Sequence, residues 1–263
     1  MTKLASRSAA LLALTSMAGV ASAGNTYSWD GIYAGANAGG GANTTCSSWT
    51  LNGPAIDPTI AAMFSNRTCP NNDTFLGGVQ IGDAFQYDRL VWAVEADFDA
   101  WSGKKYNRSL HYAGNTSPQG TYLFSGKLNP SGFGILGPRI GYAGDHWLPY
   151  LRGGAMITGG SHNSTLSYIP SGTSSTTASF SGGKNFTSFG WVAGGGIDVV
   201  LSGPWSISAE YLHADLGHGS NSTTTCTGAA SACEAFSGVS LESTHNSFTA
   251  NIFRIGINYW FGY

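Results

Sequence analysis

Eight segments of this chain have the composition of β-strands, and the connections between them alternate between long and very short. The predicted strands cover residues 32–40, 75–86, 89–101, 131–143, 147–159, 187–201, 205–216 and 247–263. The connections contain about 34, 2, 29, 3, 27, 3 and 30 residues. Long connections on one side and tight turns on the other are typical of a membrane-spanning up-and-down barrel. We therefore predict an all-β fold, an eight-stranded antiparallel up-and-down transmembrane β-barrel with four long surface loops.

Apolar and polar side chains alternate within the predicted strands. One face of the last strand is apolar and ends in aromatic residues: Phe253, Ile255, Ile257, Tyr259 and Phe261. The opposite face carries Arg254, Gly256 and Asn258. A soluble β-sandwich also has two faces, but a wholly apolar face with aromatic residues at its end is typical of a strand that faces lipid. The polar face would then line the barrel interior.

The composition excludes the usual helical membrane protein. Charged residues make up 10% of the chain, against about 25% in ordinary soluble domains. No segment after residue 23 contains about 18 consecutive apolar residues, the minimum for a helical span. A closed β-barrel is the other structure that satisfies every backbone hydrogen-bonding group within lipid.

The first 23 residues have the features of a secretory signal peptide. Lys3 and Arg7 are basic, residues 9–20 are apolar, and an A-x-A cleavage motif ends at Ala23. An N-terminal membrane anchor is the alternative, but the apolar stretch is shorter than the ~20 residues of a helical span. We predict a signal peptide at 1–23 and a mature barrel domain at 24–263. Without Lys3 and Arg7, the 12 basic residues fall to 10 against 14 acidic ones, a formal charge of −4, so we expect no nucleic-acid partner.

Motifs spread along the chain resemble those of a known family. They are WDGIYAG at 29–35, GGVQIG at 77–82, VWAVEADF at 91–98, PRIGYAGDHWLPYLRGGA at 138–155, GWVAGGGIDVVL at 190–201, WSISAEYLHADLG at 205–217 and FRIGINYWFGY at 253–263. In this order they are similar to the opacity-type outer-membrane β-barrel family, in particular its alphaproteobacterial porin-like surface proteins. The resemblance implies an OmpA-like transmembrane barrel in the bacterial outer membrane, with short periplasmic turns and long surface loops.

The chain departs from the family pattern at two places. Asp83 stands where the family usually has an aromatic residue, and alternation from Val79 and Ile81 points it toward lipid. It therefore lies at a rim of the barrel or beside a β-bulge, which leaves the register of the second strand open. The C-terminal pattern Arg254-x-Gly256-x-x-Tyr259-x-Phe261 resembles the signal read by the barrel-assembly machinery, but two residues follow Phe261 where the family commonly stops.

Charged residues on the inward faces predict an interior network. By alternation the inward-pointing charges are Glu95, Asp97, Asp198, Glu210, Arg139, Arg152 and Arg254. Unpaired charges in a narrow barrel are costly, so we expect these groups to pair. The pairs would either hold the barrel together or form a gate to a narrow pathway. Because side chains just fill an eight-stranded interior, we expect a plugged lumen.

The four cysteines lie in predicted long loops of an exported protein, which folds in an oxidising compartment. Four cysteines allow three connectivities. We favour Cys46 with Cys69 and Cys226 with Cys233, because each pair closes a loop whose ends the barrel holds together. Free thiols or a metal site are the alternatives, and the lack of C-x-x-C spacing disfavours a metal.

No catalytic, metal-binding or cofactor-binding pattern stands out in the sequence. His213 and Asp215 share a strand face and could orient an imidazole for hydrolysis, but a rim hydrogen bond also explains them. The predicted loops are rich in Ser, Thr, Asn and Gly. They also carry aromatic residues that could contact a surface ligand: Trp49, Phe64, Tyr106, Tyr112, Tyr168 and Phe236.

The sequence thus predicts a monomeric bacterial outer-membrane β-barrel protein with an envelope-structural and surface-interaction role. A narrow small-solute or ion channel is the alternative, and an outer-membrane hydrolase is a remote one. We expect its partners to be outer-membrane lipids and lipopolysaccharide, the barrel-assembly machinery and an unidentified surface ligand.

Overall fold

The computed structural model describes residues 27–52, 69, 71–101, 105–112, 120–172, 178–217, 221–228 and 240–261. The described chain forms ten β-strands: β1 (Gly31–Asn52), β2 (Asn71–Tyr87), β3 (Leu90–Trp101), β4 (Lys105–Tyr112), β5 (Gly120–Tyr142), β6 (Trp147–Pro170), β7 (Ala178–Ser202), β8 (Trp205–Asp215), β9 (Asn221–Gly228) and β10 (Ser240–Trp260). Within these residues, no helix has the length and apolar character needed to cross a membrane. The predicted signal peptide lies outside the described residues and stays a prediction.

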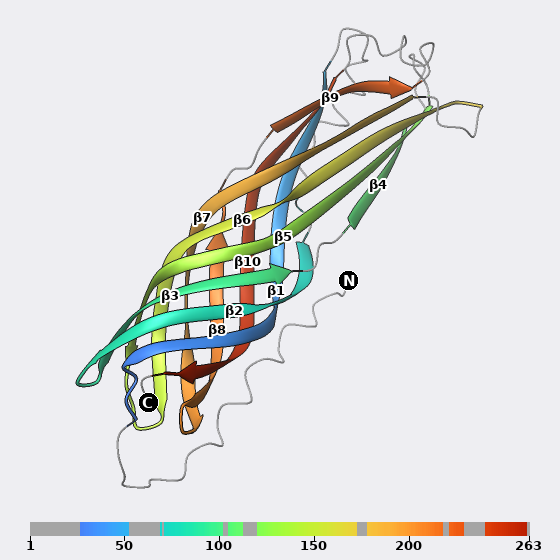
Figure 1. The fold of residues 1–263 in the computed structure, drawn as a ribbon. Coiled ribbons are helices and arrows are strands. Elements are labelled where there is room, and N and C mark those ends of the chain that lie inside the picture. Colours follow the sequence, from blue (N-terminus) through green and yellow to red (C-terminus); the bar gives the residue numbers. More distant parts are fainter. Residues whose placement is uncertain are drawn as a thin grey trace, which may run out of the picture.

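Eight of the described strands close into an antiparallel barrel, which Figure 1 shows as a tilted cylinder. Neighbours pair in the order β1-β2-β3-β5-β6-β7-β8-β10, and β10 pairs back with β1, with Tyr33 opposite Trp260. The closed ring leaves no unpaired strand edge within the barrel. The predicted eight-stranded up-and-down barrel is therefore confirmed.

The short connections lie at the end of the barrel where β1 begins and β10 ends. Asp88 and Arg89 join β2 to β3, and Gly203 and Pro204 join β7 to β8. Asp88 and Gly203 have φ angles of 54° and 52°, in the left-handed region that tight hairpin turns require. Aspartate and glycine adopt this conformation more readily than other residues. We call this end the turn end and the opposite one the surface end.

The strands are longer than the sequence predicted, so the four surface loops are shorter. β5 and β6 remain paired as far as Gly120 opposite Pro170, and β1 and β10 as far as Asn52 opposite Ser240. Both β4, which pairs with β5, and β9, which pairs with β7 and β10, fall inside predicted loops. These segments lack apolar alternation. Their strand structure comes from backbone hydrogen bonds that continue the barrel register.

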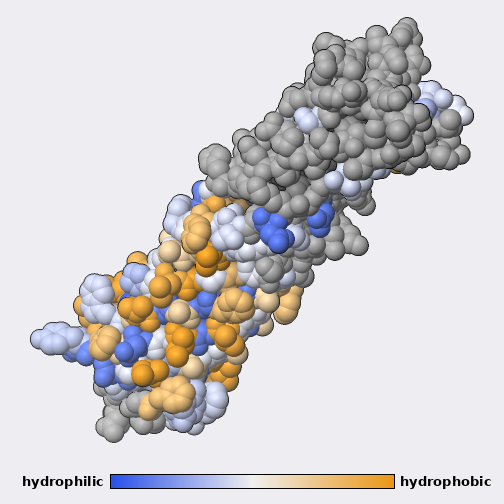
Figure 2. Space-filling model, turned by 45° about the horizontal axis from the view of Figure 1, so that its top comes forward, coloured by the Kyte–Doolittle hydropathy of each residue, from blue (hydrophilic) through white to orange (hydrophobic). Residues whose placement is uncertain are grey.

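Apolar side chains on the outward faces form a belt around the barrel. In β3, Trp92, Val94 and Phe98 are exposed on the outward face, while Ala93, Glu95 and Asp97 are buried on the inward face. Figure 2 shows the hydrophobic residues gathered over the part of the molecule away from the grey region. An outward apolar belt on a closed barrel is the surface that a lipid bilayer covers.

Asp83 interrupts this belt without a bulge. β2 pairs with β3 in one register from Leu76 to Tyr87, and Asp83 lies between Ile32 of β1 and Val94 of β3. The β-bulge considered from the sequence is therefore wrong. Because the register is regular, alternation places Asp83 outward, where it is exposed.

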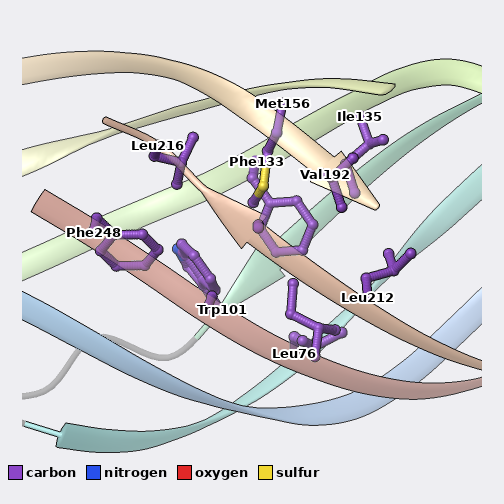
Figure 3. Packing of buried hydrophobic residues seen from close by; sticks show 12 residues of the cluster. Leu76, Trp101, Phe133, Ile135, Met156, Val192, Leu212, Leu216 and Phe248 are labelled. Carbon is purple, nitrogen blue, oxygen red and sulfur yellow. The ribbon is translucent and has the colours of Figure 1, made fainter. Parts of the chain in front are cut away.

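Two apolar clusters fill the interior, one at each end of the barrel. The surface-end cluster consists of Leu76, Trp101, Phe133, Ile135, Met156, Val192, Leu212, Ala214, Leu216, Phe248, Ala250 and Ile252. Figure 3 shows side chains from several strands converging there, and the Trp101 ring lies 4.8 Å from Phe133 and 5.3 Å from Phe248 between ring centroids. The turn-end cluster consists of Tyr27, Trp29, Tyr33, Ala84, Val91, Ala93, Ala143, Leu148 and Trp260.

The residues before β1 close the turn end. The Tyr27 backbone amide donates to the Asp145 carbonyl at 3.3 Å, and the Trp29 amide donates to Gln86 Oε1 at 2.7 Å. Trp29 is fully buried, with its ring centroid 5.3 Å from that of Trp260. This segment therefore folds across the mouth of the barrel and contributes two aromatic side chains to the turn-end cluster.

Inward glycines leave space for large side chains in the narrow interior. A Cβ added at Gly78 would lie 2.3 Å from Asp99 Oδ1 and 2.3 Å from the Phe98 carbonyl oxygen. A Cβ at Gly196 would lie 2.6 Å from the Tyr150 hydroxyl. At these two positions glycine therefore has a steric cause, because both lie beside bulky inward residues.

The disulfide predicted between Cys46 and Cys69 is present. Cys46 lies in β1 rather than in a loop, because β1 continues past the predicted end, and the bond links it to the chain just before β2. Cys226 lies in β9. Cys233 lies outside the described residues, so the pairing of Cys226 with Cys233 stays a prediction.

We predict that Gly78→Ala destabilises the barrel by about 1–3 kcal/mol, because overpacking forces backbone or side-chain shifts. Gly77→Ala is the matched control. Gly77 points outward, and the nearest atom to an added Cβ there is 3.5 Å away. Both substitutions restrict the unfolded chain equally. Urea unfolding of the purified protein, followed by the heat-dependent change in gel mobility, measures the difference. Equal midpoints for the two variants would contradict the steric argument.

Candidate functional site: the charged layer inside the barrel

A layer of buried charged residues lies between the two apolar clusters. Along β3, Val91 and Ala93 belong to the turn-end cluster and Trp101 to the surface-end cluster, and the carboxylates lie between them. We call the following group the lumen charge layer: Glu95, Asp97 and Asp99 from β3, Arg139 from β5, Arg152 from β6, Asp198 from β7, Glu210 from β8 and Arg254 from β10. Six of the eight barrel strands therefore contribute a charge.

Glu95 joins two arginines at the centre of the layer. Arg139 Nη1 lies 3.1 Å from Glu95 Oε2, and Arg152 Nη1 lies 2.6 Å from Glu95 Oε1. Arg139 also pairs with Asp198 through its other terminal nitrogen, and Arg152 with Asp97. Arg139 of β5 therefore links β3 to β7, and Arg152 joins β6 to β3.

Arg254 extends the chain of pairs toward the surface end. Its Nε donates to Glu210 Oε2 at 2.6 Å, and its Nη2 lies 2.6 Å from Asp97 Oδ1. Its Nη1 lies 3.0 Å from Asp99 Oδ2. One arginine thus pairs with three carboxylates from two other strands, and charge-assisted hydrogen bonds of this kind are the strong ones.

Neutral polar residues line the remaining side of the interior. Asn37 of β1 donates to Gln80 Oε1 at 3.1 Å, and Gln80 of β2 donates to Asn258 Oδ1 at 2.6 Å. Tyr33 of β1 donates its hydroxyl hydrogen bond to Glu95. The guanidinium carbon of Arg139 lies 3.4 Å from the centroid of the Tyr150 ring, a cation–π contact. All eight barrel strands therefore take part in one polar layer.

The layer holds more acidic than basic groups. Five carboxylates face three guanidinium groups, a formal excess of two negative charges when all are ionised. Three buried carboxylate oxygens in the described structure have no hydrogen-bond donor: Asp99 Oδ1, Asp198 Oδ1 and Glu210 Oε1. The electrostatic potential of the interior therefore favours cations over anions.

The structure brings together all seven charged residues that alternation placed in the lumen. Sequence reasoning missed one charged member of the layer, Asp99, and several of its neutral neighbours: Tyr33, Asn37, Gln80 and Tyr150. Asp99 shares the inward face of Glu95 and Asp97, so the same alternation could have included it. Tyr33 and Tyr150 carried no such signal, because an inward tyrosine can serve an apolar cluster or a polar layer equally.

The other predicted positions are distributed around the barrel. Gly256 points inward beside Arg254, whereas Tyr259 and Phe261 point outward at the turn end, with ring centroids 5.0 Å apart. Their role in assembly stays a prediction. Tyr168, considered a surface contact, is buried with 7% of its surface exposed. Phe64 and Phe236 lie outside the described residues, as do the side chains of Trp49, Tyr106 and Tyr112.

His213, which was considered for hydrolysis, contacts Asn251 rather than Asp215. His213 Nδ1 lies 2.9 Å from Asn251 Oδ1, while Asp215 accepts a hydrogen bond from the Gly217 amide at 3.0 Å. An amide oxygen, not a carboxylate, therefore orients this imidazole. Within the described part of the chain, no group of three or more His, Cys, Asp or Glu residues could hold a metal ion.

We predict that Arg254→Leu destabilises the barrel by about 3–5 kcal/mol, because it leaves buried Asp99 without its cation and takes one cation away from both Asp97 and Glu210. Arg89→Leu is the control, since Arg89 is an exposed arginine in the β2–β3 turn. Urea unfolding in lipid or detergent compares the two variants with the unaltered protein. If Arg254→Leu lowered the free energy of unfolding no more than Arg89→Leu does, water would already solvate the lumen charge layer.

Comparisons with known proteins give a consistent set of similarities. The model of the outer membrane protein beta-barrel domain family matches residues 9–261. The chain is 27% identical over 195 residues to the 31 kDa outer-membrane immunogenic proteins of Brucella melitensis biotype 1 and Brucella suis biovar 1, which covers 73% of this chain and 73% of each relative. It is also similar to the crystal structure of OprG from Pseudomonas aeruginosa. That match has a TM-score of 0.42 and 12% identity, and it covers 88% of this chain and 97% of that one.

Proposed function

Because the chain belongs to the outer membrane protein beta-barrel domain family, we propose that it is a closed barrel that supports the envelope and presents long strands at the cell surface. Membership confirms the resemblance that the sequence motifs carry. The protein is a multi-pass β-barrel of the bacterial outer membrane. The side chains that fill the barrel and the strands that extend beyond the apolar belt support a more specific role.

The observation that carries the proposal is the filled interior. Two apolar clusters enclose a charged layer, and the side chains of that layer are almost fully buried. Arg152 and Asp97 have no exposed side-chain surface. An ion crossing this barrel would have to displace aromatic side chains at both ends and separate ion pairs at the centre. This supports an envelope protein rather than an open pore.

The extended strands support the surface-interaction part of the proposal. β6 continues for 13 residues beyond Ile157, an exposed apolar residue of the belt, and ends at Pro170. At about 3.3 Å per residue this is roughly 40 Å along the strand. β5, β7, β1 and β10 extend with it, so the paired backbone itself continues well beyond the lipid belt. Such a sheet would present an unidentified surface ligand with a defined surface.

Assembly and oligomeric state complete the proposal. The barrel-assembly machinery would read the pattern from Arg254 to Phe261, in which Tyr259 and Phe261 point outward at the turn end. The closed ring of paired strands is consistent with a monomer. The proposal assigns no catalysis, since an amide rather than a carboxylate orients His213.

A narrow cation channel is the second candidate, and the excess of carboxylates in the lumen charge layer favours it. If the layer rearranged, the remaining negative charge would attract cations and repel anions. The two candidates differ in what the unaltered protein does at rest. A plugged barrel conducts little, whereas a channel has a continuous aqueous path.

We predict that the purified mature protein shows no steady conductance in planar bilayers and at most rare, brief openings. Heat-dependent gel mobility of the same sample verifies that the barrel is folded. Arg254→Leu should raise the frequency of openings, because it removes the cation that pairs with Asp99 and one of the two that pair with Asp97 and with Glu210. Large, stable, cation-selective conductance from the unaltered monomer would contradict the plugged barrel and favour the channel.

A further inference from the structure

A group of polar and aromatic side chains faces outward at the surface end of the apolar belt. Trp191 of β7, Tyr211 and His213 of β8, and Asn251 of β10 make up this group, which we call the rim cluster. His213 lies directly opposite Asn251 in the pairing of β8 with β10. None of the four side chains belongs to the interior clusters or to the lumen charge layer.

The rim cluster is organised around one amide oxygen. Tyr211 Oη donates to Asn251 Oδ1 at 2.7 Å, and His213 Nδ1 lies 2.9 Å from the same oxygen. The Trp191 and His213 rings lie 5.7 Å apart between centroids. About half of the surface of Trp191 and of Tyr211 is exposed.

These bonds leave hydrogen-bonding groups directed away from the protein. Because Asn251 Oδ1 can only accept, His213 must carry a proton on Nδ1, which makes Nε2 an acceptor in the neutral ring. The Asn251 Nδ2 amide has no acceptor among the described residues. The cluster therefore offers both donors and acceptors on a face that elsewhere contacts hydrocarbon.

The position of the cluster places these groups at the edge of the outer leaflet. Eight residues separate His213 from Trp205, which lies at the turn end of the belt on the same strand. At about 3.3 Å per residue and a tilt of about 40°, they span roughly 20 Å of membrane height, against an apolar band of about 25 Å. Polar groups at this depth are costly without partners, and lipid headgroups are the nearest source.

The chemistry of the cluster fits a sugar better than a phosphate. Its four side chains include no lysine or arginine, and Asp215, the next outward residue of β8, adds a carboxylate that would repel a phosphate. Aromatic rings present apolar faces to the C–H faces of a sugar, while amide, imidazole and hydroxyl groups bond its hydroxyls. The outer leaflet of a bacterial outer membrane supplies such a ligand in its glycolipid.

We propose that the rim cluster is a binding site for the amino-sugar headgroup of the outer-leaflet glycolipid. Asn251 Nδ2 and His213 Nε2 bond the sugar hydroxyls, and Trp191 covers one face of the ring. This site depends on the outer-membrane location and not on whether the lumen conducts. Failure of the glycolipid test would therefore leave the plugged barrel unaffected.

Native mass spectrometry of the purified mature protein, titrated in detergent with lipid A whose phosphate groups have been removed, tests the site. We expect a 1:1 complex with lipid A that phosphatidylglycerol does not displace. The double variant His213→Leu and Asn251→Leu should bind lipid A at least about tenfold more weakly, since it removes two side chains that would hydrogen-bond the sugar. Tyr211→Phe should weaken lipid A binding less than the double variant does, because it removes one hydrogen bond to Asn251 Oδ1 and leaves the Asn251 amide in place.

The control is Trp205→Leu, which alters an outward aromatic residue at the turn end and should leave lipid A affinity within about twofold of the unaltered value. Heat-dependent gel mobility shows that each variant is folded. If the double variant bound lipid A as tightly as the unaltered protein, the site would be refuted. Equal affinity for lipid A and phosphatidylglycerol would show nonspecific lipid contact and would also overturn the proposal.

Discussion

The pairing of buried arginines with carboxylates is the interaction on which the rest of this structure depends. Arg139, Arg152 and Arg254 lie on three strands and reach carboxylates on β3, β7 and β8. Side chains alternate with a period of two, so a one-residue slip of any of these strands would turn its charge into lipid. The cost of an unpaired charge in hydrocarbon therefore fixes the register of the barrel, and with it the outward apolar belt.

The same constraint explains how the narrow interior is filled. The apolar clusters at the two ends of the interior exclude water from the charged layer that lies between them. Large inward side chains require small ones beside them, which is why Gly78 lies against Asp99 and Gly196 against Tyr150. A plugged lumen leaves the outer surface for interaction with lipid, and the extended strands for interaction beyond it.

Alternation predicted most of the barrel and its interior, because lipid and lumen impose opposite chemistry on adjacent residues. In β3, for example, alternation places Trp92 on the face toward lipid and Glu95 on the face toward the lumen, and the chemistry of each residue fits its side. The outer halves of β5 and β6 could not be predicted, since Ser, Thr and Asn segments alternate no apolar residues and are held by backbone pairing to neighbouring strands. The pairing of Tyr33 with Glu95 and the rim contact of His213 with Asn251 depend on residues far apart in sequence, and only the closed register brings them together.

A double-mutant cycle between Arg254 and Asp97 tests most directly whether ion pairs in the lumen charge layer stabilise the barrel. The free energy of unfolding would be measured for the unaltered protein, Arg254→Leu, Asp97→Asn and the combination of both. If the two side chains pair in a dry interior, the losses are not additive, and the coupling energy is about 1–3 kcal/mol. Additive losses, within about 0.5 kcal/mol, would show that water separates the two groups and would contradict the account.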